Sequence, residues 1–129
     1  MSTDVIATER FPEPRPATAV DAGGQVRLAG WRCTRCVHPL ALRAPWCPLC
    51  RGDLREHDFG PHGTVWSSTV VRVPLPGREP PYALAYVDLD DGPRVLGHLS
   101  SPHRLPVGAA VTLRGSSALG DLLFDGTDA

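Results

Sequence analysis

Four cysteines within residues 33–50 are the side chains of this chain best suited to chemistry. They form two Cys-x2-Cys pairs that are separated by ten residues. Two such pairs can bring four thiolates around one tetrahedral metal ion, with Zn–S bonds of about 2.3 Å. We therefore predict one structural Zn2+ per chain, with the ligands Cys33, Cys36, Cys47 and Cys50.

Other uses of the four cysteines fit the sequence less well. Two disulfides would require an oxidising compartment, and the N-terminus has no secretory signal. A redox pair of the thioredoxin type uses one Cys-x2-Cys within a βαβ pattern, which is absent. Iron also binds four thiolates and stays open as an alternative. Four thiolates leave no position for a substrate water, so we expect the metal to be structural and His38 to be a loop residue.

No second set of residues predicts a self-sufficient catalytic site. The remaining histidines have no serine, cysteine or carboxylate pattern beside them, and the G-x-S-x-G and glycine-rich phosphate-binding motifs are missing. All 13 cationic residues are arginine, which excludes lysine Schiff-base chemistry. The aspartates at 88, 90 and 91 precede Gly92-Pro93 and predict a reverse turn.

The segments around the cysteines predict short strands. Glycine and proline together make 27 of 129 residues, and no segment keeps a helical period over three turns. A short strand from residue 25 leads into the cysteines. The later strands, which are rich in β-branched residues, are expected at 62–73, 82–89, 94–99, 110–115 and 121–124. Five short strands predict a small OB-type barrel, and an SH3-like barrel fits the pattern nearly as well.

The mostly β chain is therefore divided into three parts. Residues 1–24 contain three closely spaced prolines and predict an irregular tail, residues 25–58 a short zinc ribbon, and residues 59–125 the barrel. No apolar run approaches the roughly 18 residues that span a bilayer. We expect a cytoplasmic protein that has no membrane segment.

The net charge of −1 and the isoelectric point near 6.5 provide no basic field for nucleic acid. A nucleic-acid-binding zinc-ribbon and OB module is kept as the alternative function. Its bases would stack on Trp66, Tyr82 and Tyr86. In a small barrel, however, tryptophan and tyrosine more often fill or cover the core.

The order of these parts resembles a known family. The segments that carry the resemblance are RLAGWRCTRC, CPLCRG, GTVWSSTVV and PYALAYVDLDDGPRVLGHL. They are similar to the acyl-CoA-associated proteins that join a rubredoxin-like zinc ribbon to a C-terminal OB-fold and accompany thiolase-like enzymes. The resemblance covers roughly residues 26–115 and assigns the zinc to the same four cysteines. Two features depart from the family: a proline-rich stretch replaces the usual aromatic-containing helix, and Val37 stands where glycine is common.

The resemblance implies an accessory subunit in lipid or polyketide metabolism. Such a subunit docks on a thiolase-like or ketosynthase-like enzyme as a hetero-oligomer and helps bind acyl-CoA. The partner supplies the catalytic residues of a condensing, thiolytic or retro-aldol reaction. We predict that Arg72, Arg78 and Arg94, near the barrel loops, contact CoA phosphates, and that loop 74–81 contributes to the interface. An independent enzyme remains a further alternative.

Overall fold

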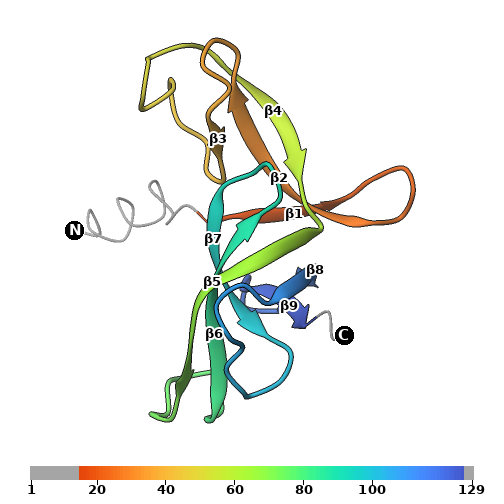
Figure 1. The fold of residues 1–129 in the computed structure, drawn as a ribbon, viewed down its shortest axis with the longest axis vertical. Coiled ribbons are helices and arrows are strands. Elements are labelled where there is room, and N and C mark those ends of the chain that lie inside the picture. Colours follow the sequence, from red (N-terminus) through yellow and green to blue (C-terminus); the bar gives the residue numbers. More distant parts are fainter. Residues whose placement is uncertain (1–14, 127–129) are drawn as a thin grey trace, which may run out of the picture.

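The structure, a computed structural model, describes residues 15–126 and consists of strands joined by turns and loops. An upper sheet carries the cysteines, and a closed barrel lies below it (Figure 1). No helix that is long and apolar enough to cross a membrane occurs in residues 15–126. The strands are β1 (Ala17–Val20), β2 (Val26–Cys33), β3 (Pro39–Leu40), β4 (Leu54–Phe59), β5 (His62–Val71), β6 (Tyr82–Leu89), β7 (Arg94–Leu99), β8 (Ala110–Ser116) and β9 (Leu122–Gly126).

The upper sheet is built around β2, which pairs antiparallel with β1, β3 and β4. The pairing of β2 with β4 is the longest of the three and runs from Leu28 opposite Phe59 to Cys33 opposite Leu54. It places the first cysteine at the end of the central strand. The second pair of cysteines lies in the loop between β3 and β4. The sheet therefore holds both cysteine pairs at one end of the molecule.

Two strands of this sheet differ from the sequence prediction. Residues 17–20 belong to the predicted irregular tail but form β1, while the rest of that tail up to residue 14 lies outside the described residues. β4 was not predicted because its LREHDF sequence is mostly polar and only Phe59 is fully buried. Both strands form because they pair with the long β2. This pairing depends on the folded chain and cannot be seen in the residues of β1 or β4 alone.

The barrel closes in the order β5-β6-β7-β9-β8, and β8 pairs back with β5. All its pairs are antiparallel except β7 with β9. This is the five-stranded Greek-key barrel of the OB-fold, which confirms the predicted fold class. The observed strands β6 and β7 have the same bounds as the predicted ones, because both alternate apolar and polar residues between clear turn signals.

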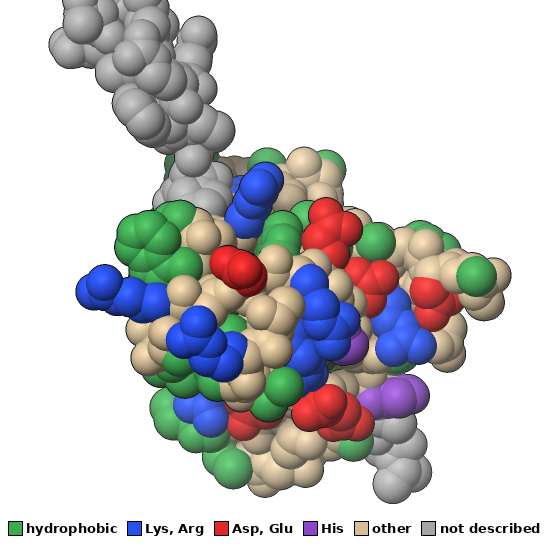
Figure 2. Space-filling view, turned by 90° about the horizontal axis from the view of Figure 1, so that it is seen from above, with side chains coloured by type: hydrophobic (Ala, Val, Ile, Leu, Met, Phe, Trp, Pro, Cys, Tyr) green, Lys and Arg blue, Asp and Glu red, His purple; other side chains and the backbone are tan. Residues whose placement is uncertain are grey.

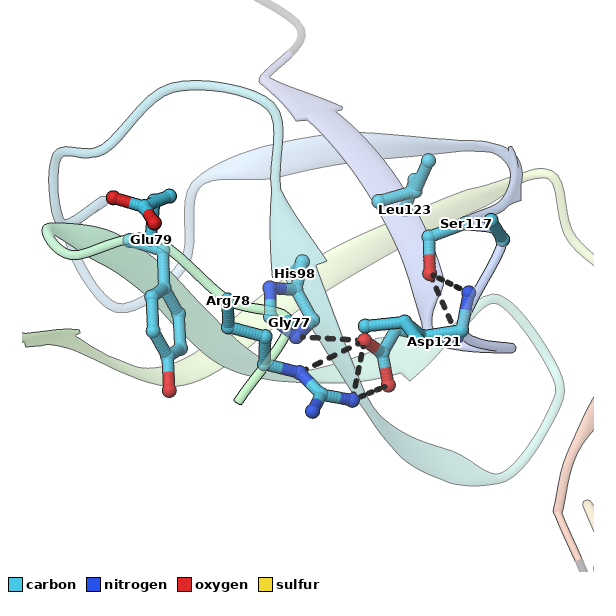
Figure 3. Close-up of a pocket in the computed structure, with 10 residues that line it drawn as sticks. Gly77, Arg78, Glu79, His98, Ser117, Asp121 and Leu123 are labelled. Atoms are coloured by element: carbon cyan, nitrogen blue, oxygen red, sulfur yellow. Dashed lines mark hydrogen bonds and ion pairs between the residues drawn. The ribbon is translucent and has the colours of Figure 1, made fainter. Parts of the chain in front are cut away.

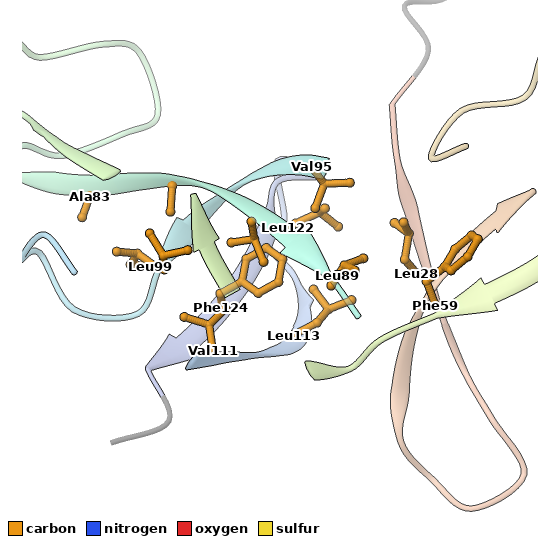
Figure 4. Close-up of a cluster of buried hydrophobic side chains, with 13 residues drawn as sticks. Leu28, Phe59, Ala83, Leu89, Val95, Leu99, Val111, Leu113, Leu122 and Phe124 are labelled. Carbon is orange, nitrogen blue, oxygen red and sulfur yellow. The ribbon is translucent and has the colours of Figure 1, made fainter. Parts of the chain in front are cut away.

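One hydrophobic core joins the barrel to the upper sheet. Leu28 and Phe59 come from the sheet, and they pack in the same cluster as Leu89 and the barrel interior around Phe124 (Figure 4). Gly92, in the turn between β6 and β7, leaves room for the Phe59 ring. A Cβ atom at this position would lie 2.9 Å from a ring carbon of Phe59. The two parts therefore share buried apolar surface.

A buried arginine also connects the two parts. The Arg32 side chain on β2 is about 10% exposed and lies over the Phe59 ring at 5.1 Å. Its guanidinium donates hydrogen bonds to the carbonyl oxygen of Val37 beside the cysteines and to that of Asp91 in the β6–β7 turn, at 2.8 and 2.6 Å. One side chain thus links the first cysteine loop to the barrel.

Candidate metal centre and loop pocket

The four cysteine sulfurs lie within 4.8 Å of one another, so they form a group that can hold one metal ion. The Sγ atoms of Cys33 and Cys50 are 3.5 Å apart, and those of Cys36 and Cys47 are 3.6 Å apart. Tetrahedral coordination at a Zn–S distance of about 2.3 Å separates sulfurs by about 3.8 Å. Both observed distances far exceed a disulfide bond of about 2 Å. The donor set and its spacing therefore fit a metal bound by four thiolates.

The two cysteine loops repeat one backbone arrangement. The amide of Cys33 donates to the carbonyl of the residue five positions later, and the amide of Cys47 does the same. Backbone amides also point at the sulfurs; those of Arg35 and Leu49 lie 3.3 and 3.4 Å from the sulfurs of the cysteines two residues before them. These donors stabilise thiolates and so prepare the loops for a cation.

The surroundings of the sulfurs separate the pKa values of two thiols. Hydrogen bonds from backbone amides, above all that of Cys36, lower the pKa of the Cys33 thiol to about 6. The amide of His38 lowers the pKa of Cys36, but burial and the neighbouring thiols outweigh it and raise that pKa to about 12.

Gly52 is required for close packing beside the cysteine group, because a Cβ atom would lie 2.9 Å from the Cys33 sulfur. Figure 2 views this end from above and shows cationic, acidic and apolar side chains interspersed over it.

Val37 occupies a position that favours glycine. It follows the first cysteine pair with φ of 59°, and Arg51 follows the second pair with φ of 66°. A left-handed conformation is costly for a β-branched residue. The loop therefore keeps its conformation with valine in place of the family's usual glycine, and the backbone at Val37 is strained.

Replacing Val37 with glycine is expected to raise the free energy of unfolding by about 0.5–1 kcal/mol. The strain is relieved, and little packing is lost because the side chain is 60% exposed. Urea unfolding of the metal-loaded protein measures the change. Val20→Gly is the matched control, since Val20 is 68% exposed within β1 and should lose stability. Equal losses in the two variants would contradict the role of the φ angle.

A second candidate site lies at the opposite end of the barrel. A cavity of about 340 Å³, the loop pocket, is formed between loop 74–81 and the segment between β8 and β9. Figure 3 shows its polar wall, where Arg78, His98 and Asp121 meet. Loops at this end of an OB-fold are its common ligand-binding elements. Its wall includes Gly77, Arg78, Glu79, Tyr82, His98 and Asp121.

Asp121 is the centre of the polar wall, and its side chain is only 13% exposed. Its carboxylate accepts three hydrogen bonds from Arg78, at 2.8–3.1 Å, and another from Arg15 at 2.8 Å. The Nε2 atom of His98 lies 3.3 Å away. Burial holds the pKa of His98 below its usual value, although Asp121 acts in the opposite sense. His98 is therefore neutral at pH 7.

Asp121→Asn is expected to lower the free energy of unfolding by about 2 kcal/mol, because Arg15 and Arg78 lose a largely buried carboxylate. The pKa of His98 should fall further, since the charge that raises it is gone. Thermal unfolding and NMR titration of His98 test the two effects. Asp125→Asn is the control, because the Asp125–Arg114 pair is largely exposed and contributes little. An unchanged His98 titration would contradict the proposed contact.

The structure does not bring the three predicted phosphate ligands together. Arg72 is exposed, directly follows β5, and forms no ion pair among residues 15–126. Arg78 lines the loop pocket but is paired with Asp121. Arg94 pairs with Asp88 at 2.6 Å. Asp88, opposite Arg94, lies six positions after Tyr82 on β6, which places the Arg94 backbone about 20 Å from the end of the barrel that holds the loop pocket, and the Arg94 guanidinium lies over the Trp66 ring at 4.0 Å.

Sequence reasoning missed two features of these sites. It found no catalytic pattern beside His98 and did not consider Asp121, since Asp121 lies 23 positions later and only barrel closure brings the two side chains together. It also favoured a core role for Trp66, whereas that side chain is 49% exposed at a bulge in β5. The polar wall had no local sequence signal, because its members come from three separate segments.

The fold and the cysteine group define this chain as a zinc-ribbon-like sheet joined to an OB-fold barrel. Residues 56–116 match the family model described as "ChsH2, C-terminal OB-fold domain". A "DUF35 domain-containing scaffold protein" from Pyrococcus furiosus is 37% identical over 92 residues, which cover 67% of each chain. The chain belongs to this DUF35 family of OB-fold proteins that accompany thiolase-like enzymes.

Two further proteins are similar to the chain. A "Probable enoyl-CoA hydratase alpha subunit" from Thermomonospora curvata is 33% identical over 119 residues. The match covers 82% of this chain and 37% of that longer relative. The solved structure titled "Ltp2-ChsH2(DUF35) aldolase" superposes with a TM-score of 0.62 at 29% identity, covering 79% of this chain and 86% of the other.

Proposed function

We propose that this chain is an accessory subunit of a thiolase-superfamily enzyme that catalyses a condensing, thiolytic or retro-aldol reaction. It docks on that enzyme as a hetero-oligomer and helps bind or channel the acyl-CoA substrate. The partner supplies the catalytic residues. The observation that carries this proposal is the similarity of the joined sheet and barrel to a chain of a structure titled as an Ltp2-ChsH2(DUF35) aldolase.

The proposed metal is Zn2+, one per chain, held by Cys33, Cys36, Cys47 and Cys50. Zinc prefers tetrahedral thiolate sites, and four protein ligands leave no open position for substrate. Its role is therefore to hold the two cysteine loops in place. Because Arg32 bonds to the first loop and to the barrel turn, the metal also stabilises the placement of the barrel.

The acyl-CoA contact is assigned to the loop end of the barrel. Arg72 is exposed there, and Arg78 lines the loop pocket, so both can approach a phosphate. Arg94, the third predicted phosphate contact, lies toward the other end of β6 and, like Arg78, already pairs with a carboxylate. Loop 74–81 exposes Leu75, 49% accessible, and is the proposed interface element.

Purification of the tagged chain from its native host, with mass spectrometry and metal analysis, tests the proposal. We expect a thiolase-like enzyme in near-equal molar amount and about one zinc per chain. The enzyme's acyl-CoA turnover should fall when the subunit is removed and return when it is added. Leu75→Glu should weaken the complex, whereas Val107→Glu, at a 77% exposed position outside the loop, should not.

Two outcomes would overturn the accessory role. Turnover of an acyl-CoA by the chain alone would make it an independent enzyme. Salt-dependent binding of single-stranded DNA, together with the absence of an enzyme partner, would favour the nucleic-acid module. The exposed Trp66 and Tyr86, whose ring centroids are 5.9 Å apart, would then provide stacking surfaces.

A further inference from the structure

The described part of the chain begins on the outer face of the barrel. Arg15 donates a hydrogen bond to the Asp121 carboxylate at 2.8 Å. Arg15 and Pro16 both line a hollow of about 200 Å³, whose wall also includes Leu84 of β6 and Leu96 of β7. The first described residues are therefore held against the barrel, and the preceding chain joins them at this hollow.

An exposed apolar surface continues from this hollow. A second hollow of about 240 Å³ shares Leu84 and Leu96 with the first and extends to Tyr86. Tyr86 lies opposite Leu96 across β6 and β7, and its ring meets the Trp66 ring edge-on at 5.9 Å. Trp66, Tyr86 and Leu96, which we call the aromatic patch, are each 45–49% exposed. No strand within residues 15–126 covers them.

The charges beside the aromatic patch are already paired. The Arg94 guanidinium lies over the Trp66 ring at 4.0 Å and pairs with Asp88 at 2.6 Å. On the other side of the patch, Arg15 pairs with Asp121. Exposed charges that are already paired add little to the binding of a further ion. Shape and apolar contact, rather than net charge, therefore select what covers the patch.

The segment directly before Arg15 has the composition that such a surface binds. Residues 11–14 read Phe-Pro-Glu-Pro, so Phe11, Glu13 and Arg15 each precede a proline. A residue before proline is restricted to extended backbone, and proline-rich segments favour the polyproline II conformation. Grooves lined by aromatic side chains bind such segments, because these are extended before binding and lose little conformational entropy.

The segment is long enough to cover the aromatic patch. Trp66 on β5 and Leu96 on β7 flank Tyr86 on β6, so the patch spans two strand spacings, or about 10 Å. Phe11 lies five positions before Pro16, which corresponds to about 15 Å of polyproline II backbone. Because Pro16 already lies beside Leu96, the Phe11 ring can reach the far side of the patch.

We propose that residues 11–14 of the same chain pack over the aromatic patch as a polyproline II segment. Chain continuity favours this occupant over a separate molecule, because a short tether holds the segment at a roughly millimolar effective concentration. The Arg15–Asp121 hydrogen bond fixes the end of the segment that lies nearest the barrel. A protein that binds this face of the barrel must first displace the segment.

NMR spectroscopy of the full metal-loaded chain tests this contact. We expect nuclear Overhauser effects between the Phe11 ring and the side chains of Tyr86 and Leu96. Phe11→Ser should remove the contact and shift the indole resonance of Trp66, which the spectrum of Trp66→Phe identifies. Ile6→Ser is the control, because it also removes an apolar side chain but lies outside the proline-rich segment. It should leave the Trp66 resonance unchanged.

Substitutions in the described part of the chain test the same contact from the other side. Leu96→Glu places a charge in the aromatic patch and should abolish the Phe11 contacts. Leu42→Glu, at an exposed position in the loop between β3 and β4, should keep them. A synthetic peptide of residues 1–14 should bind the Phe11→Ser chain saturably and return its Trp66 resonance toward the wild-type position. The same peptide carrying Phe11→Ser should bind at least about tenfold more weakly.

Three results would overturn the assignment of this segment to the patch. The first is a Phe11→Ser chain whose Trp66 resonance is unchanged, with no Phe11 contacts in the wild type. The second is a set of concentration-dependent shifts of Tyr86 and Leu96 without Phe11 contacts, which would assign the patch to a second copy of the chain. The third is an equal effect of Phe11→Ser and Ile6→Ser. None of these measurements requires the enzyme partner, so the accessory role is decided separately by co-purification.

Discussion

Cys47→Ser is expected to abolish stoichiometric metal binding and to unfold the cysteine-bearing sheet. Cys47 is fully buried, and its Sγ atom lies 3.6 Å from that of Cys36, so the metal connects its loop to the first cysteine loop. Structural zinc contributes about 10–16 kcal/mol in small zinc-binding peptides, which is as large as the whole stability of a typical domain. Metal analysis and amide hydrogen exchange of residues 26–59 measure the loss.

His38→Ala is the control for this substitution. His38 lies two residues after Cys36, and its backbone carbonyl, which the substitution keeps, accepts the amide of Cys33. The variant should bind one metal per chain. Removing the metal from the wild-type chain, like the Cys47→Ser substitution, should lower its affinity for the enzyme partner. Full metal binding by Cys47→Ser, or an unchanged partner affinity after demetallation, would contradict the structural role of the centre.

Phe59→Ala is expected to lower the free energy of unfolding by about 3–5 kcal/mol. The ring is 2% exposed and fills the space between Gly30 of β2 and Gly92 of the barrel turn. Its removal leaves a cavity between the two parts and takes away the surface under the Arg32 guanidinium. Urea unfolding, followed with separate probes in the sheet and the barrel, should show that the two parts no longer unfold in one transition.

Two variants separate this effect from ordinary loss of packing. Phe59→Leu keeps much of the volume and should cost clearly less than the alanine variant. Phe124→Ala removes a fully buried ring inside the barrel and should also cost about 3–5 kcal/mol, without uncoupling the sheet from the barrel. If Phe59→Ala costs less than about 1 kcal/mol, the two parts fold independently.

The cysteine group and Phe59 belong to one connected set of contacts between the sheet and the barrel. The metal holds the first cysteine loop, that loop accepts a hydrogen bond from Arg32, and Arg32 bonds to the β6–β7 turn. Phe59 fills the interior of the same junction. We therefore expect loss of the metal to loosen the β6–β7 turn as well as the cysteine loops.

The cysteine group and most of the barrel follow from the amino-acid sequence alone. The two Cys-x2-Cys pairs bring their sulfurs together through local turns, so their spacing alone predicts the grouping. β6 and β7 follow from alternating residues around an Asp-Asp-Gly-Pro turn, and their bounds are as predicted. In both cases the deciding interactions lie between residues that are near one another in the chain.

The contacts between side chains that are distant in the sequence depend on the folded chain as a whole. β1 and β4 exist because β2 offers them edges, and Asp121 meets Arg15, Arg78 and His98 because the barrel closes. The physical reason is that pairing and burial of long-range partners depend on the whole chain, whereas propensity and spacing report only on its immediate neighbours.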